Sequence, residues 1–204
     1  MTSVAVVDHG AGNLVSIAQG LERAGAAVTV TGTPDGLAGV DGVVLPGVGT
    51  TGAAMRRLTA AGLVEPLRAW DGPLLGICVG LQLFFEHSEE DGTDALGLMP
   101  GRVTRLEGAP LLPHIGWNDV SFMSDPLFAG IPEEATFYFV HSFAVVPEEA
   151  GAIIARTEYG ESFVAGARSS NRVGVQFHPE RSGPAGLRML ANFVTACGEA
   201  ANAA

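Results

Sequence analysis

The sequence contains no lysine, although its 204 residues include 11 arginines. Without a lysine amine, the chain has no residue for Schiff-base chemistry, and it lacks the Gly-Lys-Ser/Thr ending of a phosphate-binding loop. Acidic residues outnumber basic ones, so that the formal net charge is −11. This balance argues against broad nucleic-acid binding, which depends on basic patches.

Cysteines and long apolar runs are also scarce. The two cysteines, Cys78 and Cys197, are too few for a disulfide framework in a chain of this length. No apolar run approaches the roughly 18 residues of a membrane span, and no signal-peptide pattern opens the sequence. The acidic run Glu86–Asp91 holds one histidine but is more typical of a solvated helix end than of a metal site. We therefore expect a cytoplasmic protein without membrane contact, metal or cofactor.

Apolar strand patterns alternate with helical patterns in the first half of the chain. The strands are expected at Ser3–Val7, Ala27–Thr31, Gly42–Leu45 and Leu74–Ile77, with helices after Asn13, from Thr51 and over Leu63–Trp70. Continuous apolar strands between helices are typical of a parallel sheet covered on both faces. In such sheets, functional sites collect at the carboxyl ends of the strands.

After about Leu98 the pattern changes to short strands, several of which alternate apolar and polar residues as antiparallel strands do. They are expected at Arg102–Leu106, Thr136–Val140, Ala152–Thr157, Ser162–Ala167 and Arg172–Phe177, before a last helix from Pro184. The sequence therefore predicts an α/β three-layer sandwich. Its central sheet is mostly parallel and gains antiparallel strands in the C-terminal half, all within one domain over residues 1–204.

A cysteine flanked by glycines follows the apolar run Leu74–Ile77. Cys78 lies two residues from both Gly76 and Gly80, and apolar residues at helical spacing come next: Leu81, Leu83, Phe84 and Phe85. This pattern predicts a strained strand-to-helix turn whose helix N–H groups favour a thiolate. A lone cysteine at a strand end is more often a small core side chain, however, so a nucleophile needs a base elsewhere.

The candidate base is His178, which follows the expected strand Arg172–Phe177. If that strand joins the sheet near Leu74–Ile77, the imidazole can reach the sulfur and move its proton. Glu180 lies two residues further on and can orient the ring. Taken alone, a His-Pro-Glu sequence is a strand-end turn, and His9, His87 and His114 receive no catalytic role.

Pro46–Gly49 is a glycine-rich loop between a strand and a helix. It can be a phosphate cradle or a plain turn, but beside a cysteine nucleophile an oxyanion hole fits better. One backbone N–H would come from this loop and one from Val79, the residue after the nucleophile.

Together these elements resemble the class I glutamine amidotransferases, which use a Cys-His-Glu triad. The resemblance spans Val4 to Phe193, and further motifs are similar to those of the glutaminase subunits of imidazole glycerol phosphate synthases. These motifs are Leu112–Asn118, Tyr138–Phe143, Gly97–Gly101 and His178–Gly183. The composition and spacing alone indicate only a cysteine hydrolase or acyl transferase. Glutamine is indicated as the substrate only by this resemblance.

The resemblance implies a role for each matching residue. Cys78 would attack the carboxamide of glutamine and form a glutamyl thioester, with His178 as base and acid and Glu180 orienting it. The oxyanion hole would comprise Gly47, Val48, Gly49 and Val79, and the glutamine would be held by Gln82, His141, Ser142 and Phe143.

The resemblance also implies a partner, a (β/α)8-barrel cyclase subunit that receives the ammonia. That subunit would make imidazole glycerol phosphate and an aminoimidazole carboxamide ribotide in histidine biosynthesis. The expected contacts to it are Asn13, Trp117, Asn118, Tyr138 and Arg181. Arg181 stands where lysine is common in these subunits, and its planar side chain can change the local contact.

Two other interpretations stay open. The chain can be the glutaminase of another synthase, in pyridoxal phosphate, anthranilate or purine synthesis; Trp117-Asn118 and the Pro46–Gly49 loop favour the histidine pathway. It can also be a non-enzymatic binding protein that keeps Cys78 for redox sensing. The presence of both His178 and Glu180 disfavours this second interpretation.

Overall fold

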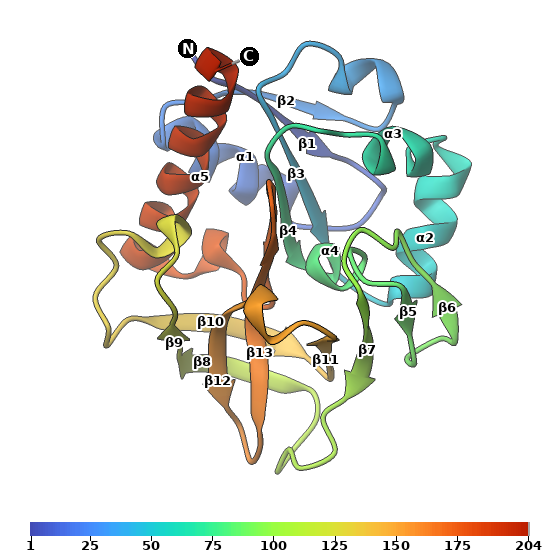
Figure 1. Cartoon of the computed structure of the whole chain (residues 1–204), viewed down its shortest axis with the longest axis vertical. Coiled ribbons are helices and arrows are strands. Elements are labelled where there is room, and N and C mark those ends of the chain that lie inside the picture. The colour runs from blue at the N-terminus through green and yellow to red at the C-terminus, as the bar shows by residue number, and fades with distance from the viewer. Residues whose placement is uncertain (204) are drawn as a thin grey trace.

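A twelve-stranded sheet forms the centre of the protein in the computed structural model, which describes residues 1–203 (Figure 1). One half of the sheet is parallel and has the strand order β2-β1-β3-β4-β14. These strands are β1 (Ser3–Val7), β2 (Ala27–Thr31), β3 (Gly42–Gly47), β4 (Leu74–Cys78) and β14 (Arg172–Val175). Since β4 lies between β3 and β14, the chain leaves three neighbouring strands at the same edge.

The other half of the sheet is built mainly from antiparallel pairs. The order continues from β14 through β13, β11, β7, β5 and β6, while β12 pairs with β13 and β9. A separate two-stranded sheet pairs β8 with β10. The bounds are β5 (His87–Ser88), β6 (Thr93–Asp94), β7 (Gly101–Arg105), β8 (His114–Asp119), β9 (Ser121–Phe122), β10 (Thr136–His141), β11 (Phe143–Pro147), β12 (Ile153–Glu158) and β13 (Ser162–Ser169). The pattern did not predict β5, β6, β8, β9 or β11.

Helices cover both faces of the parallel half (Figure 1). On one side α1 (Leu14–Arg23) packs against α5 (Gly183–Ala203), and both contact β1. The other side carries α2 (Thr51–Ala60), α3 (Val64–Arg68) and the short α4 (Val79–Gln82). Single 3-10 turns occur at Pro34–Leu37, Pro126–Phe128, Ala150–Ala152 and Pro179–Arg181. The predicted three-layer α/β fold is confirmed. Within residues 1–203, no helix has both the length and the apolar character needed to cross a membrane.

Three glycines allow α4 to lie directly on β3 and β4. A Cβ on Gly76 would lie 2.7 Å from the carbonyl carbon and oxygen of Gly80, and one on Gly47 would lie 2.7 Å from Cβ of Val79. A Cβ on Gly80 would overlap the carbonyl oxygen of Leu45. The glycines around Cys78 are therefore required by backbone contacts, as the sequence pattern predicts.

We expect Gly80→Ala to lower the free energy of unfolding by about 3 kcal/mol or more, because the new methyl group meets a fixed backbone oxygen. Urea denaturation measures the change. Gly151→Ala is the matched control, since a Cβ there meets nothing within 4 Å and φ of Gly151 is ordinary. A Gly80→Ala variant as stable as Gly151→Ala would contradict the close contact.

Candidate active site

Cys78 occupies a strained turn between β4 and α4. Its φ is 55°, a left-handed value that only one other non-glycine residue in the described chain, Ser170, adopts. Such strain in a residue with a side chain is typical of functional sites. The side chain is buried, with 3% of its residue surface exposed. The strained turn that the glycine pattern predicts is therefore present.

The helix after Cys78 is shorter than its apolar pattern suggests. It ends at Gln82, and the predicted helical residues Leu83, Phe84 and Phe85 lie in a turn. The carbonyl of Phe84 accepts hydrogen bonds from the N–H groups of Leu98 and Met99, which replace the bonds of a longer helix. Cys78 thus faces the N–H groups of one helical turn, and a long helix dipole does not act on it.

His178 lies at the same sheet edge as Cys78. Strand β14 runs parallel to β4 and pairs Val175 with Ile77, which is the neighbour relation that a base for Cys78 requires. The strand ends two residues earlier than predicted, because the chain then turns toward β10. There the N–H of His178 donates to the carbonyl oxygen of Tyr138 at 2.8 Å. This bond fixes the backbone that carries the imidazole.

Glu180 holds the imidazole of His178. Nδ1 of His178 lies 2.9 Å from Oε1 of Glu180, and both side chains are at least 95% buried. Nε2 of His178 has no hydrogen-bond partner within residues 1–203, and it is the ring nitrogen left for the reacting atoms. Burial alone would lower the pKa of His178. The negative charge of the Cys78 sulfur and the Glu180 carboxylate outweigh burial and raise that pKa to about 10.

A small pocket opens in front of Cys78. Its volume is about 200 Å³, below the roughly 300–1,000 Å³ of pockets for drug-sized ligands, and suits a small metabolite. Ten residues line it: Val48, Gly49, Cys78, Val79, Gln82, Glu90, Val140, His141, Ser142 and Phe143. All four predicted glutamine contacts and three of the four predicted oxyanion residues are among them. The fourth, Gly47, does not line the pocket and lies close against Val79.

Glu90 is a pocket residue that the sequence pattern does not indicate. The pattern of the acidic run Glu86–Asp91 predicts a solvated helix end, but the run lies at the hairpin of β5 and β6. There the N–H of Thr51 donates to Oε2 of Glu90 at 3.3 Å, and the N–H of Gly52 donates to Asp91 at 2.9 Å. Both carboxylates therefore stabilise the N-terminus of α2. Burial raises the pKa of Glu90.

The residues expected to face a partner lie in three places. The guanidinium of Arg181 stacks 3.9 Å from the ring centre of Tyr138, and Trp117 meets the same ring edge-on at 6.2 Å. Trp117 is 56% exposed, so this cluster can be reached from outside. Asn118 faces the opposite side of β8, where Nδ2 donates to the carbonyl oxygen of Glu158 at 2.9 Å. Asn13 is exposed at the start of α1, and its side chain makes no capping bond.

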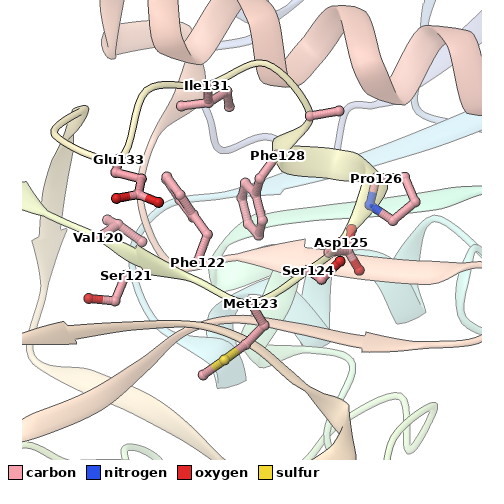
Figure 2. A pocket seen from close by; sticks show the side chains of 11 residues that line it. Val120, Ser121, Phe122, Met123, Ser124, Asp125, Pro126, Phe128, Ile131 and Glu133 are labelled. Atoms are coloured by element: carbon pink, nitrogen blue, oxygen red, sulfur yellow. The ribbon is translucent and has the colours of Figure 1, made fainter.

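A larger hollow lies away from Cys78 and holds none of the predicted site residues. It measures about 760 Å³ and is formed by β9 and the following loop, within residues 120–133 (Figure 2). Asp125, its most buried polar group, already binds Arg168 through two hydrogen bonds. In the described residues, no cluster of three or more His, Cys, Asp or Glu side chains has the arrangement of a metal site.

We expect NMR to find His178 protonated at pH 7 and titrating near pH 10 in the folded protein. Because the pKa of this histidine is about 6.5 in the unfolded chain, its contribution to stability is full below pH 6.5 and is lost as the pH rises toward 10. In Cys78→Ser the negative sulfur is gone, and this pKa should fall by about one unit or more. Cys197→Ser is the control. An unchanged midpoint in Cys78→Ser would contradict the pairing of sulfur and imidazole.

The chain is similar to known proteins over nearly its whole length. A family model described as glutamine amidotransferase class-I matches residues 5–197. Two relatives, from Synechococcus sp. (strain JA-3-3Ab) and Moorella thermoacetica, are named imidazole glycerol phosphate synthase subunit HisH. Each is 47% identical; the alignments cover 94% and 100% of this chain and 92% and 99% of the relatives.

Solved structures show the same fold. A protein from Thermoplasma acidophilum, described as a putative GMP synthase subunit, superposes with a TM-score of 0.76 at 23% identity, covering 100% of this chain and 97% of that one. A structure of PurLQS from Thermotoga maritima gives 0.72 at 19% identity and covers 95% of this chain and 98% of its own. The family model and the 47% identical relatives show that the chain belongs to the class I glutamine amidotransferase family, together with the HisH subunits of imidazole glycerol phosphate synthase.

Proposed function

We propose that this protein is the glutaminase subunit of an imidazole glycerol phosphate synthase and hydrolyses glutamine to glutamate and ammonia. The observation that carries the proposal is the meeting of Cys78 with the His178–Glu180 pair at one edge of parallel strands, beside a small pocket. The names of the relatives support the choice of glutamine as substrate and histidine biosynthesis as the pathway.

The reaction begins at the Cys78 sulfur. The thiolate attacks the carboxamide carbon of glutamine, and the imidazolium of His178 then gives its proton to the departing nitrogen as the C–N bond breaks. Ammonia and a glutamyl thioester result. His178 next takes a proton from water, whose oxygen attacks the thioester carbon, and glutamate leaves as the sulfur is released. Glu180 keeps Nε2 of the ring pointed at the reacting atoms throughout.

Negative charge develops on the carbonyl oxygen during both attacks. The backbone N–H of Val79 and one from the Gly47–Gly49 loop are the proposed donors to it, and each such donor is typically worth ~2.7–4 kcal/mol in the transition state. Gly49 has a φ of 90°, so the loop uses a conformation that suits glycine. The loop is held at its start, where Nε2 of His9 lies 2.7 Å from the carbonyl oxygen of Pro46.

The pocket also offers groups for the amino-acid end of glutamine. Glu90 is the carboxylate among its lining residues and suits the positive ammonium group of the substrate. Gln82 and the segment from His141 to Phe143 line the same space and suit the remaining polar groups. Burial raises the pKa of Glu90, and a bound ammonium would favour its ionised form.

The proposed partner is a (β/α)8-barrel cyclase that uses the ammonia. Trp117, Tyr138 and Arg181 form the exposed aromatic and cationic cluster that we assign to this contact, with Asn13 on the neighbouring helix. Asn118, although adjacent to Trp117, points away from the cluster and donates to the carbonyl oxygen of Glu158. We further propose that the chain works as one domain over residues 1–204 in the cytoplasm.

The experiment that tests the function is glutamate release from glutamine by the chain alone, and then with the cyclase and its nucleotide. We expect low activity alone and a large rise with the loaded partner. Cys78→Ala should abolish hydrolysis, because the nucleophile is gone, and should leave ammonia-driven synthesis by the complex intact. No glutamate release in either state would overturn the proposal. Activation by the synthase of another pathway would reassign the partner.

Cys197→Ala is the matched control for Cys78→Ala. Cys197 is fully buried in α5, and burial raises the pKa of its thiol to about 12, so it is not a nucleophile at neutral pH. Glutaminase activity should remain within about twofold of the wild type in this variant, because the substitution alters only the packing around α5 and no residue that lines the pocket. Loss of turnover in a folded Cys197→Ala variant would contradict the assignment of Cys78.

We expect Glu90→Gln to raise KM for glutamine by about tenfold with a smaller change in kcat. The amide removes the charge that faces the ammonium group but keeps an oxygen for the N–H of Thr51. Steady-state glutamate release measures both constants. Glu89→Gln is the control, because its exposed carboxylate does not line the pocket. Equal KM values in the two variants would rule out ammonium binding by Glu90.

A further inference from the structure

We propose that Gln176 is a positioning residue for glutamine hydrolysis, which donates a hydrogen bond to the Cys78 sulfur and fixes the side-chain amide of Gln82. The inference rests on the proposed glutaminase function. Gln176 lies between strand β14 and His178 and is fully buried. Neither the triad nor the pocket lining includes it.

The carbonyl oxygen of Phe143 can only accept hydrogen bonds, and it sets the direction of the network around Gln176. Two side chains lie 2.9 Å from this oxygen, Nε2 of Gln82 and Nδ1 of His141. Both nitrogens must therefore carry the hydrogen. One backbone atom thus sets which end of the Gln82 amide and which tautomer of His141 are present.

The orientation of Gln82 decides the orientation of Gln176. The second N–H of Gln82 Nε2 points to Oε1 of Gln176 at 3.2 Å. Since that oxygen is turned to Gln82, the amide nitrogen of Gln176 faces the other way, and it lies 3.5 Å from Sγ of Cys78. An N–H donor at this distance favours negative charge on the sulfur.

The same polarity leaves one atom of Gln82 for a ligand. Both hydrogens of Gln82 Nε2 are committed inside the protein, to Phe143 and Gln176. Gln82 lines the pocket in front of Cys78, so its free Oε1 is an acceptor for an N–H group of the bound substrate. Without Gln176 the amide of Gln82 would lose one of the two partners that fix its orientation.

A chain of neutral histidines fixes the Phe143 end of the network. Because Nδ1 of His141 carries the hydrogen, its bare Nε2 accepts from Nδ1 of His114 at 3.2 Å. Nε2 of His114 is then bare in turn and faces Nδ2 of Asn118 at 3.5 Å. Burial keeps both rings neutral, lowering the pKa of His141 to about 3 and that of His114 as well. Donation therefore runs from Asn118 through the two histidines to the Phe143 oxygen, and from Gln82 through Gln176 to the sulfur.

The test is Gln176→Met, which keeps a similar volume but removes both hydrogen bonds. In the assembled synthase we expect kcat for glutamine to fall by about tenfold and KM to rise by about fivefold, as loss of one hydrogen bond on each side predicts. Ammonia-driven synthesis should not change. Gln19→Met is the matched control, because Gln19 is exposed on α1.

Gln176→Glu separates the two roles. At a pH at which the new carboxyl group is ionised, one glutamate oxygen still accepts from Gln82, while the other places a negative charge and no hydrogen-bond donor beside the sulfur. We expect KM to stay within about twofold of the wild type while kcat falls by about tenfold or more. In the full chain, iodoacetamide should alkylate Cys78 several-fold more slowly at neutral pH in this variant than in the wild type, because the sulfur has lost its N–H donor. The other titratable groups around the sulfur and the pocket are His178, His141 and Glu90, and none of them is substituted in these variants.

The outcomes distinguish this inference from the proposed function itself. Wild-type protein that releases no glutamate would overturn the glutaminase assignment. Active wild-type protein, with folded Gln176→Met and Gln176→Glu variants that match Gln19→Met in kcat, KM and alkylation, would overturn the positioning role. Lower melting temperature with unchanged kcat and KM would assign Gln176 to packing alone. If Gln176→Met does not fold, the split between kcat and KM in Gln176→Glu decides.

Discussion

The parallel pairing of β4 with both of its neighbours is the constraint on which the site depends. In one register Ile77 lies opposite Pro46 of β3 and Val175 of β14, and Cys78 lies opposite Gly47. The nucleophile, the loop proposed for the oxyanion and the strand that leads to His178 therefore leave the sheet side by side. A shift of one residue in either ladder would turn these groups to the other face of the sheet.

Two buried histidines near the pocket show how neighbours decide charge. Burial lowers the pKa of both rings, but His178 faces the sulfur of Cys78 and the carboxylate of Glu180, and its pKa rises to about 10. His141 faces a backbone carbonyl and two other imidazoles, and its pKa falls to about 3. The same residue type thus supplies a mobile proton at one place and a fixed hydrogen-bond donor at the other.

The sequence predicts the parts of this structure that local patterns determine. Continuous apolar runs indicate the parallel strands, and the glycines beside Cys78 indicate the strained turn. The roles of Glu90 and Gln176 could not be predicted, because their neighbours come from distant segments of the chain. The β5–β6 hairpin brings Glu90 to the pocket, and the bonds of Gln82 to Phe143 and Gln176 form only in the folded chain. The length of α4 could not be predicted for a related reason, since the apolar residues Leu83–Phe85 suit a helix and a buried turn equally well. The direction of Asn118 depends on the pleat of β8, a strand that the pattern did not predict.

The polarity of the buried amide network comes from a main-chain group, the carbonyl of Phe143. Every amino acid supplies that oxygen, so a change of side chain at position 143 alters the pocket lining but reverses no hydrogen bond of the network. The cost of change falls instead on Gln82, His141 and Gln176, whose side chains must match a direction that they do not set. Selection on the direction of these hydrogen bonds therefore acts on three side chains, whereas the backbone oxygen that sets the direction is present whatever residue occupies position 143.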